Sequence, residues 1–269
     1  MTTPEVTIST SGMTFEDVIA IARNCARVRV SSDALIEVGK TRGRIDDLAA
    51  AADPVYGVST GFGALANRHV SPELRTQLQR SLIRSHAAGM GAPVEREVVR
   101  ALMALRLKTL CSGRTGVRPV VVQTMAALLN AGITPVVHEY GSLGCSGDLA
   151  PLSHCALVLM GEGRATGPDG VERPVRELLA DAEIEPIELR EKEGLALING
   201  TDGMLGMLVL AIADLTMLCT SADVIAAMSV EGLLGTDQVF GRELHEPLRP
   251  HPGQAQSAAN MMRTLAGSA

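Results

Sequence analysis

Residues 141–152 have the sequence Gly-Ser-Leu-Gly-Cys-Ser-Gly-Asp-Leu-Ala-Pro-Leu, in which three glycines fall within seven positions. An extended-looking run, residues 133–138, precedes this stretch, and an apolar pattern at helical spacing follows it as far as Met160. The stretch is therefore predicted to be a tight loop that leads directly into a helix. Ser146 or Asp148 is the expected N-cap, and Pro151 falls in the first helical turn.

The residues of this loop leave several interpretations open. The simplest is a turn with a helix cap. A phosphate-binding loop is disfavoured, because no lysine follows the last glycine and the spacing is not that of a dinucleotide-binding loop. A third interpretation is chemical: the amide nitrogen of Gly147 can attack the carbonyl carbon of Cys145, since glycine lets the chain fold back tightly. Loss of water from the ring, and of the Ser146 hydroxyl as water, would leave a methylene group conjugated to two carbonyls. Such a group is a strong electrophile.

The stretch Gly-Ser-Leu-Gly-Cys-Ser-Gly-Asp-Leu-Ala-Pro-Leu-Ser-His resembles the histidine and aromatic amino acid ammonia-lyases. Their prosthetic group, 4-methylidene-imidazol-5-one, forms from Ala-Ser-Gly, and a subset that includes bacterial histidine ammonia-lyases has Cys in the first place. Only the main chain of that residue enters the ring. The resemblance implies that Cys145, Ser146 and Gly147 supply the electrophile, and that Ser142 and Asp148 shape the loop for cyclisation.

A second glycine-rich loop, residues 55–63, has the sequence Val-Tyr-Gly-Val-Ser-Thr-Gly-Phe-Gly and holds one of only two tyrosines. By itself, Tyr56 is as readily a packing residue with a satisfied hydroxyl as a member of a mobile functional loop. The family carries a Tyr-Gly-Val-x-Thr-Gly-Phe-Gly loop whose tyrosine is regarded as the catalytic base, so the resemblance implies that role for Tyr56. A phenol titrates near ~10 in water, so a base at neutral pH requires a local perturbation.

Two further residues are candidates for substrate binding. His86, near a predicted helix C-terminus, is by itself most simply a dipole partner, and Asn199 is by itself a turn residue beside Gly200. Histidine-specific members of the family have Ser-His-Ala-Ala-Gly at the first place, and the family has Gly-Leu-Ala-Leu-x-Asn-Gly-Thr at the second. The resemblance implies that both side chains position substrate and favours histidine or tyrosine as that substrate. Asp202 stands where the family pattern has Gln.

Composition narrows the class of protein. The net charge is −6 and the 269 residues contain no basic run, so no nucleic-acid partner is expected. The five cysteines show no CxxC spacing, which predicts reduced thiols in a cytoplasmic protein. His138, Cys145, His154 and Cys155 fit no zinc-binding spacing, and no metal is expected. No signal segment opens the chain and no apolar run looks long enough to cross a bilayer, so no membrane partner is expected.

The predicted fold is mainly α, because the chain is rich in Ala, Leu, Val and Met and lacks Trp. A small mixed N-terminal domain, residues 1–198, is expected to carry the electrophile loop, and residues 199–269 begin a long helical bundle that the resemblance implies is fumarase/aspartase-like and truncated here. A helix over 94–112 is expected to place Arg96, Arg100, Arg106 and Lys108 outside. Residues 161–171 are predicted to form a β-hairpin, and 204–233 a long buried helix.

The resemblance also implies an activity: non-oxidative deamination of L-histidine to trans-urocanate and ammonia, in a homotetramer whose sites combine several subunits. Family members are about twice as long as this chain, and their second half supplies the arginine that binds the substrate carboxylate. The chain therefore resembles an N-terminal half and is expected to lack activity alone. The alternatives are a tyrosine or phenylalanine ammonia-lyase, an aminomutase or, in a different class, a non-catalytic helical assembly module.

Overall fold

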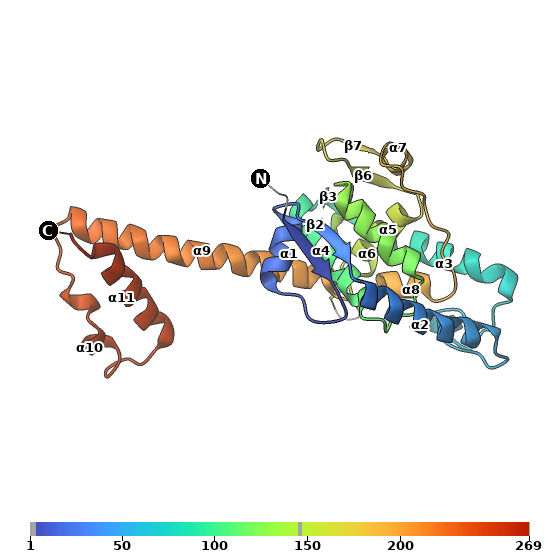
Figure 1. Cartoon of the computed structure of the whole chain (residues 1–269), viewed down its shortest axis with the longest axis horizontal. Coiled ribbons are helices and arrows are strands. Elements are labelled where there is room, and N and C mark those ends of the chain that lie inside the picture. The colour runs from blue at the N-terminus through green and yellow to red at the C-terminus, as the bar shows by residue number, and fades with distance from the viewer. Residues whose placement is uncertain (1–3, 145–146, 269) are drawn as a thin grey trace. The chain divides into compact units, whose positions relative to one another are not determined.

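The structure is a computed structural model that describes residues 4–144 and 147–268 (Figure 1). The chain divides into two compact units, residues 1–209 and 210–269. The domain boundary expected between residues 198 and 199 stays a prediction. Cys145 and Ser146 lie outside the described residues.

Helices dominate both units, as predicted. The first unit holds α1 (Phe15–Ala22), α2 (Ser32–Ala50), α3 (Pro72–His86), α4 (Arg96–Cys111), α5 (Pro119–Asn130), α6 (Leu149–Leu159), α7 (Val175–Asp181) and α8 (Glu193–Ile198). Helix α9 (Asp202–Gly232) begins in the first unit and ends in the second, which also holds α10 (Arg242–His245) and α11 (Pro252–Leu265). Two short 3-10 helices cover Gly63–Leu65 and Gln238–Phe240.

The strands are short and form small sheets at the margin of the helical core. They are β1 (Glu5–Ile8), β2 (Arg27–Val30), β3 (Met90–Pro93), β4 (Thr134–Pro135), β5 (His138–Tyr140), β6 (Arg164–Thr166) and β7 (Glu172–Pro174). β1 and β2 pair in parallel, β3 pairs with β5, and β4, β6 and β7 form an antiparallel sheet. The predicted hairpin is confirmed as β6–β7, which lies with α7 at one edge of the unit (Figure 1).

Helix α4 lies at the centre of the first unit, with α1, α2 and α5 packed against it. A second group, α3, α6 and α8, packs mutually and carries the segments that matter for the site. Local signals fix several helix ends. Thr14 and Asp17 form a reciprocal capping box at α1, and Pro119 occupies the first turn of α5.

The expectation that Arg100 and Arg106 lie outside was wrong, because both side chains are buried within the first unit. Arg100 donates from Nε to the Ile21 carbonyl at 3.0 Å and from Nη1 to the Leu129 carbonyl at 3.1 Å, at the ends of α1 and α5. Free helix-end carbonyls are natural acceptors for a guanidinium, which has five N–H groups to satisfy.

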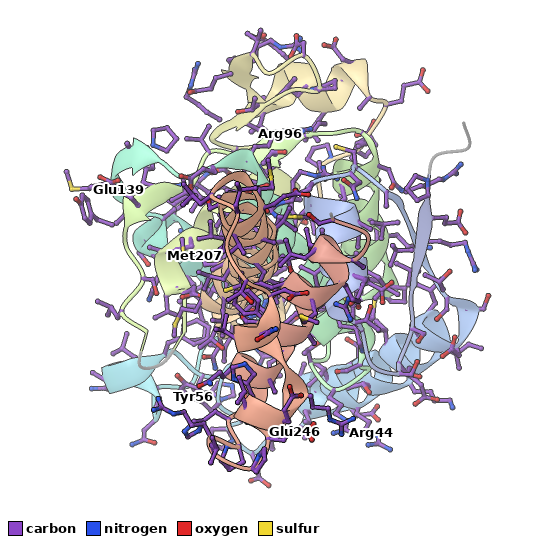
Figure 2. All side chains as sticks on the ribbon, turned by 90° about the vertical axis from the view of Figure 1, so that its left-hand side faces the viewer. Arg44, Tyr56, Arg96, Glu139, Met207 and Glu246 are labelled. Atoms are coloured by element: carbon purple, nitrogen blue, oxygen red, sulfur yellow. The ribbon has the colours of Figure 1, made fainter. Side chains whose placement is uncertain are left out.

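Helix α9 has about the predicted length, but most of its apolar side chains are exposed in this chain, although Val209 and Leu210 are buried. Those of Met207, Leu215, Met217 and Ile225 are between 48% and 69% exposed, and Figure 2 shows Met207 among them. The expectation that no apolar run could cross a bilayer was also wrong. Among the described residues, the stretch Glu193–Gly232 is long and apolar enough to do so, because its few acidic residues are widely spaced. A core helix of a soluble protein passes the same test, so the finding is weak evidence for a membrane.

Candidate active site

The predicted electrophile loop ends at a position that requires glycine. Gly147 is buried and has φ +118°, in a region of backbone space that L side chains rarely adopt. A Cβ on this residue would stand 2.8 Å from the backbone nitrogen of Gly200 and still closer to its carbonyl oxygen. The Asp148 amide donates to that same carbonyl at 2.6 Å. The loop is therefore pressed against the turn that follows α8, with no space for a side chain between them.

Asp148 connects three segments, and its side chain does not make the capping bond expected of an N-cap residue. It occupies the N-cap position of α6 but makes no side-chain capping bond there. Instead, its buried carboxylate accepts hydrogen bonds from the amides of Gly203 at 2.7 Å and Met204 at 3.0 Å, in the first turn of α9. The Ser142 hydroxyl donates to its other oxygen at 2.6 Å. The carboxylate thus fixes the loop to the start of α9, where backbone amides and the helix dipole favour a negative charge.

These residues fit the prosthetic group that the sequence suggests. Ring closure needs a glycine at the third position of the tripeptide, a backbone folded back on itself, and surroundings that hold that fold. Gly147 provides the left-handed conformation, and the Ser142–Asp148 hydrogen bond spans the tripeptide from both sides. The first two residues of the tripeptide, Cys145 and Ser146, are outside the described residues.

Asn199, predicted to position substrate, ends α8 with its side chain exposed. Its carbonyl oxygen accepts a hydrogen bond from Arg106 Nη1 at 3.4 Å. The next residue, Gly200, lies directly against Gly147 and Asp148. The structure therefore brings the Asn199 turn and the electrophile loop together, although they are far apart in the sequence.

Tyr56, the predicted base, lies in a separate loop of the first unit. Its side chain, labelled in Figure 2, is 50% exposed. The ring meets that of Phe62 edge to face, with ring centroids 6.1 Å apart. The Val55 amide donates to the Ser59 hydroxyl at 2.9 Å, which closes the turn around it. The loop reaches α8 through Gly57, which lies against Leu195.

His86, the other predicted substrate residue, is the last residue of α3 and is half-buried. Its Nδ1 lies 2.9 Å from the Leu82 carbonyl oxygen and 3.0 Å from the Ser85 hydroxyl, so its contacts are within its own helix end. The segment that follows approaches the electrophile loop, since a Cβ on Gly141 would stand 3.3 Å from the Gly89 Cα.

His154 is a residue whose structural role the sequence did not reveal. The Gly89 amide donates to its Nε2 at 3.1 Å, so this nitrogen is the unprotonated acceptor. The His138 ring lies edge-on to it at 5.4 Å between centroids. Burial, and secondarily His138, lowers the pKa of His154. The imidazole thereby attaches the segment after His86 to α6.

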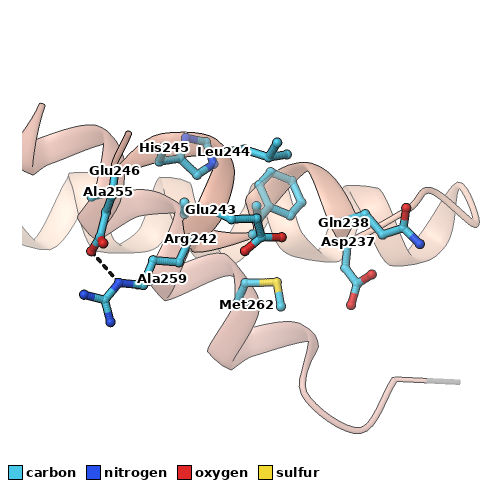
Figure 3. Close-up of a pocket in the computed structure, with 13 residues that line it drawn as sticks. Asp237, Gln238, Arg242, Glu243, Leu244, His245, Glu246, Ala255, Ala259 and Met262 are labelled. Atoms are coloured by element: carbon cyan, nitrogen blue, oxygen red, sulfur yellow. Dashed lines mark ion pairs between the residues drawn. The ribbon is translucent and has the colours of Figure 1, made fainter. Parts of the chain in front are cut away.

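A hollow of about 920 Å³ lies in the second unit, away from all of these residues in sequence (Figure 3). Residues 237–246 and one face of α11 line it, and Arg242 and Glu246 form an ion pair there. His245 in its wall is held by the Val239 carbonyl at 3.0 Å and by Gln254 at 2.8 Å. None of the predicted site residues that the structure describes lines this hollow.

Known proteins resemble this chain in sequence and in fold. Residues 13–269 match the model of a family described as aromatic amino acid lyase. The chain belongs to the aromatic amino acid lyase family. A histidine ammonia-lyase from Streptomyces avermitilis is 69% identical over 263 residues, covering 98% of this chain and 51% of that protein. A tyrosine ammonia-lyase from Cupriavidus metallidurans is 46% identical, covering 96% and 48%.

Solved structures of the family share the fold. The chain superposes on the tyrosine aminomutase from Streptomyces globisporus with a TM-score of 0.90 at 40% identity, covering 97% of this chain and 48% of that one. A MIO-dependent tyrosine 2,3-aminomutase of the same organism is 41% identical over 263 residues. Family membership thus supports a methylidene-imidazolone type of chemistry. The chain spans about half the length of the curated relatives it matches.

Proposed function

We propose that this chain contributes to the deamination of L-histidine to trans-urocanate and ammonia, using a 4-methylidene-imidazol-5-one formed from Cys145, Ser146 and Gly147. The choice of substrate rests on the difference in sequence identity within one family. The chain is 69% identical to a histidine ammonia-lyase and 46% identical to a tyrosine ammonia-lyase. The Ser85–His86 pair, typical of histidine-specific members, supports the same choice.

The reaction breaks the bond between Cα and the amino nitrogen and removes a proton from Cβ. When present, the prosthetic group supplies an electrophile that makes this elimination feasible. We assign removal of the β-proton to Tyr56, whose oxygen would accept it, because a half-exposed loop tyrosine is accessible to substrate. His86 and Asn199 would orient the substrate from the ends of α3 and α8. Ser142 and Asp148 would hold the loop in the shape that ring closure needs.

The proposal also covers the assembly of the protein into an oligomer. The exposed apolar side chains of α9 support a homo-oligomer, a tetramer in the parent enzyme, since apolar surface of this extent is normally covered. We place the protein in the cytoplasm, and the described cysteines (Cys25, Cys111, Cys155 and Cys219) are free thiols. Because the chain spans about half the length of its relatives, we expect it to deaminate little or no histidine alone.

Two measurements test the proposal. The first compares the intact mass of the purified unsubstituted chain with that of the Ser146→Ala variant. Ring closure predicts that the unsubstituted chain is lighter than its translated sequence by two water molecules and that the variant is not. The second supplies L-histidine, L-tyrosine and L-phenylalanine to the complete protein and follows the absorbance of the conjugated acid. A preference for tyrosine would contradict the substrate assignment, and equal behaviour of parent and Ser146→Ala in both assays would favour a non-catalytic assembly module.

A further inference from the structure

Arg106 is a buried cation that none of the proposed catalytic roles uses. Its side chain is 2% exposed, and it donates from Nη1 to the Ala196 carbonyl at 3.2 Å and to the Asn199 carbonyl at 3.4 Å. Its Nη2 forms an ion pair with the Asp202 carboxylate, which also accepts from the Thr109 hydroxyl at 3.2 Å. One guanidinium therefore joins the last turn of α8 to the first turn of α9.

The turn that Arg106 holds is the surface against which the electrophile loop rests. A Cβ on Gly200 would overlap Arg106 Nη2, so the guanidinium fills the space behind this residue. On its other side, Gly200 meets Gly147 and accepts the Asp148 amide at 2.6 Å. Arg106, Gly200 and Gly147 therefore form a contiguous stack from the core to the loop.

The position of Gly147 matters because its amide nitrogen is the nucleophile of ring closure, if the proposed function holds. That nitrogen forms a bond to the Cys145 carbonyl carbon, and its proton passes to the carbonyl oxygen. The resulting hydroxyl leaves with the Ser146 amide proton as the first water, which forms a double bond between the Cys145 carbonyl carbon and the Ser146 nitrogen. The second water takes the Ser146 hydroxyl together with the Ser146 α-hydrogen. An amide nitrogen is a weak nucleophile, so the closure depends on how closely the folded chain holds the two atoms.

We propose that Arg106 is a positioning residue for formation of the prosthetic group, acting through Asp202 and the Asn199–Gly200 turn to hold Gly147 in its folded-back conformation. This inference rests on the proposed function, since it concerns the same ring. It also gives a reason for Asp202 at a position where the family pattern has Gln. The buried cation needs a counter-charge, and the carboxylate supplies it.

The ion pair between Arg106 and Asp202 is better explained by the geometry that it gives to the turn after α8 than by any stability that it adds to the fold. Burial lowers the pKa of Arg106, and Asp202 acts in the opposite direction. Apolar residues of similar volume often replace a buried ion pair without loss of stability. They cannot reproduce the planar fork, which grips two carbonyls and a carboxylate at once.

The experiment compares three variants of the full chain. Arg106→Met removes the fork, and the double variant Arg106→Met/Asp202→Leu removes both charges, so that no unpaired carboxylate remains to unfold the protein. Arg100→Met is the matched control, because Arg100 is equally buried in α4 but bonds to the ends of α1 and α5. Two quantities are followed: the loss of two waters by intact mass with time after synthesis, and hydrogen exchange of the amides of Asp148, Gly203 and Met204.

We expect ring closure to slow by roughly tenfold or more in both Arg106 variants, and the three amides to exchange faster by a similar factor, while Arg100→Met resembles the parent at these positions. Closure at the parental rate in the double variant would overturn the inference, since charge neutrality would then suffice. If the parent itself closes no ring, the proposed function fails for this chain, and exchange still decides the role of Arg106. Unchanged hydrogen exchange of the three amides in the double variant would refute the positioning role of Arg106. Faster exchange confined to these amides would support that role.

Discussion

Replacing Asp148 by alanine tests whether this carboxylate holds the site together. The substitution removes the acceptor for the Gly203 and Met204 amides and for the Ser142 hydroxyl. Ser142 is exposed and can turn to water, but the Gly203 amide is in the buried part of the network. A buried donor left without a partner costs about 1–3 kcal/mol, and bonds to a charged group are at the upper end. We therefore expect the free energy of unfolding to fall by about 3–5 kcal/mol.

The variant Asp148→Asn removes the charge of this side chain and keeps its shape, so it tests the two contributions separately. Its amide oxygen can still accept from the start of α9, so only the charge-assisted part of the bonds is lost, about 1–2 kcal/mol. Asp181→Ala is the control, because Asp181 is exposed and pairs only across the surface with Arg173. Urea unfolding followed by far-UV circular dichroism measures all three. A loss below about 1 kcal/mol in Asp148→Ala, or equal losses in the Ala and Asn variants, would refute the reasoning.

Three further predictions concern the first unit. The folded state lowers the pKa of His154 below its unfolded value of 6.5. The contribution of this histidine to stability is therefore complete above pH 6.5 and is lost as the pH falls through the folded pKa. Protonation then breaks the hydrogen bond from the Gly89 amide. His154→Gln retains an acceptor and should flatten the unfolding midpoint against pH in that window, whereas an unchanged profile would contradict this role. Gly43→Ala lies within α2 with open space around it and should stabilise by about 0.5–1 kcal/mol in urea unfolding, and a loss would indicate an unseen contact. Thr14→Ala removes the α1 cap and should destabilise by about 1 kcal/mol, so an equal midpoint would show that the cap contributes nothing.

The sequence predicts best where the determinants are local. The limits of α5 follow from Pro119 at one end and the sequence Asn130-Ala131-Gly132 at the other, and the structure has those limits. The capping box at Thr14 and the β6–β7 hairpin are likewise set by residues a few positions apart. These elements form because neighbouring groups satisfy one another before any tertiary contact exists.

Prediction fails where the partner is distant in the chain. Arg106 and its Asp202 partner are 96 residues apart, and no local pattern indicates that an arginine on a helix faces the core. Asp148 occupies the predicted N-cap position of α6, but its carboxylate caps a helix that begins 54 residues later, which no local rule indicates. The glycines of the 141–152 stretch were recognised as special from composition. Among them, Gly147 cannot be replaced by another residue, because its backbone lies against Gly200. Only the fold shows that contact.

The contact between Gly147 and Gly200 also sets an order of events in time. During synthesis, the tripeptide leaves the ribosome well before the residues that press against it, since Asp148 and its partner Gly203 are 55 positions apart. The nascent segment is therefore an ordinary peptide, with nothing behind Gly147 to hold it folded back. On this view, a reactive electrophile cannot arise in an unfinished chain, where stray thiols and amines would consume it. Under the proposed function, the electrophile would form only after the residues around Gly200 have folded against Gly147.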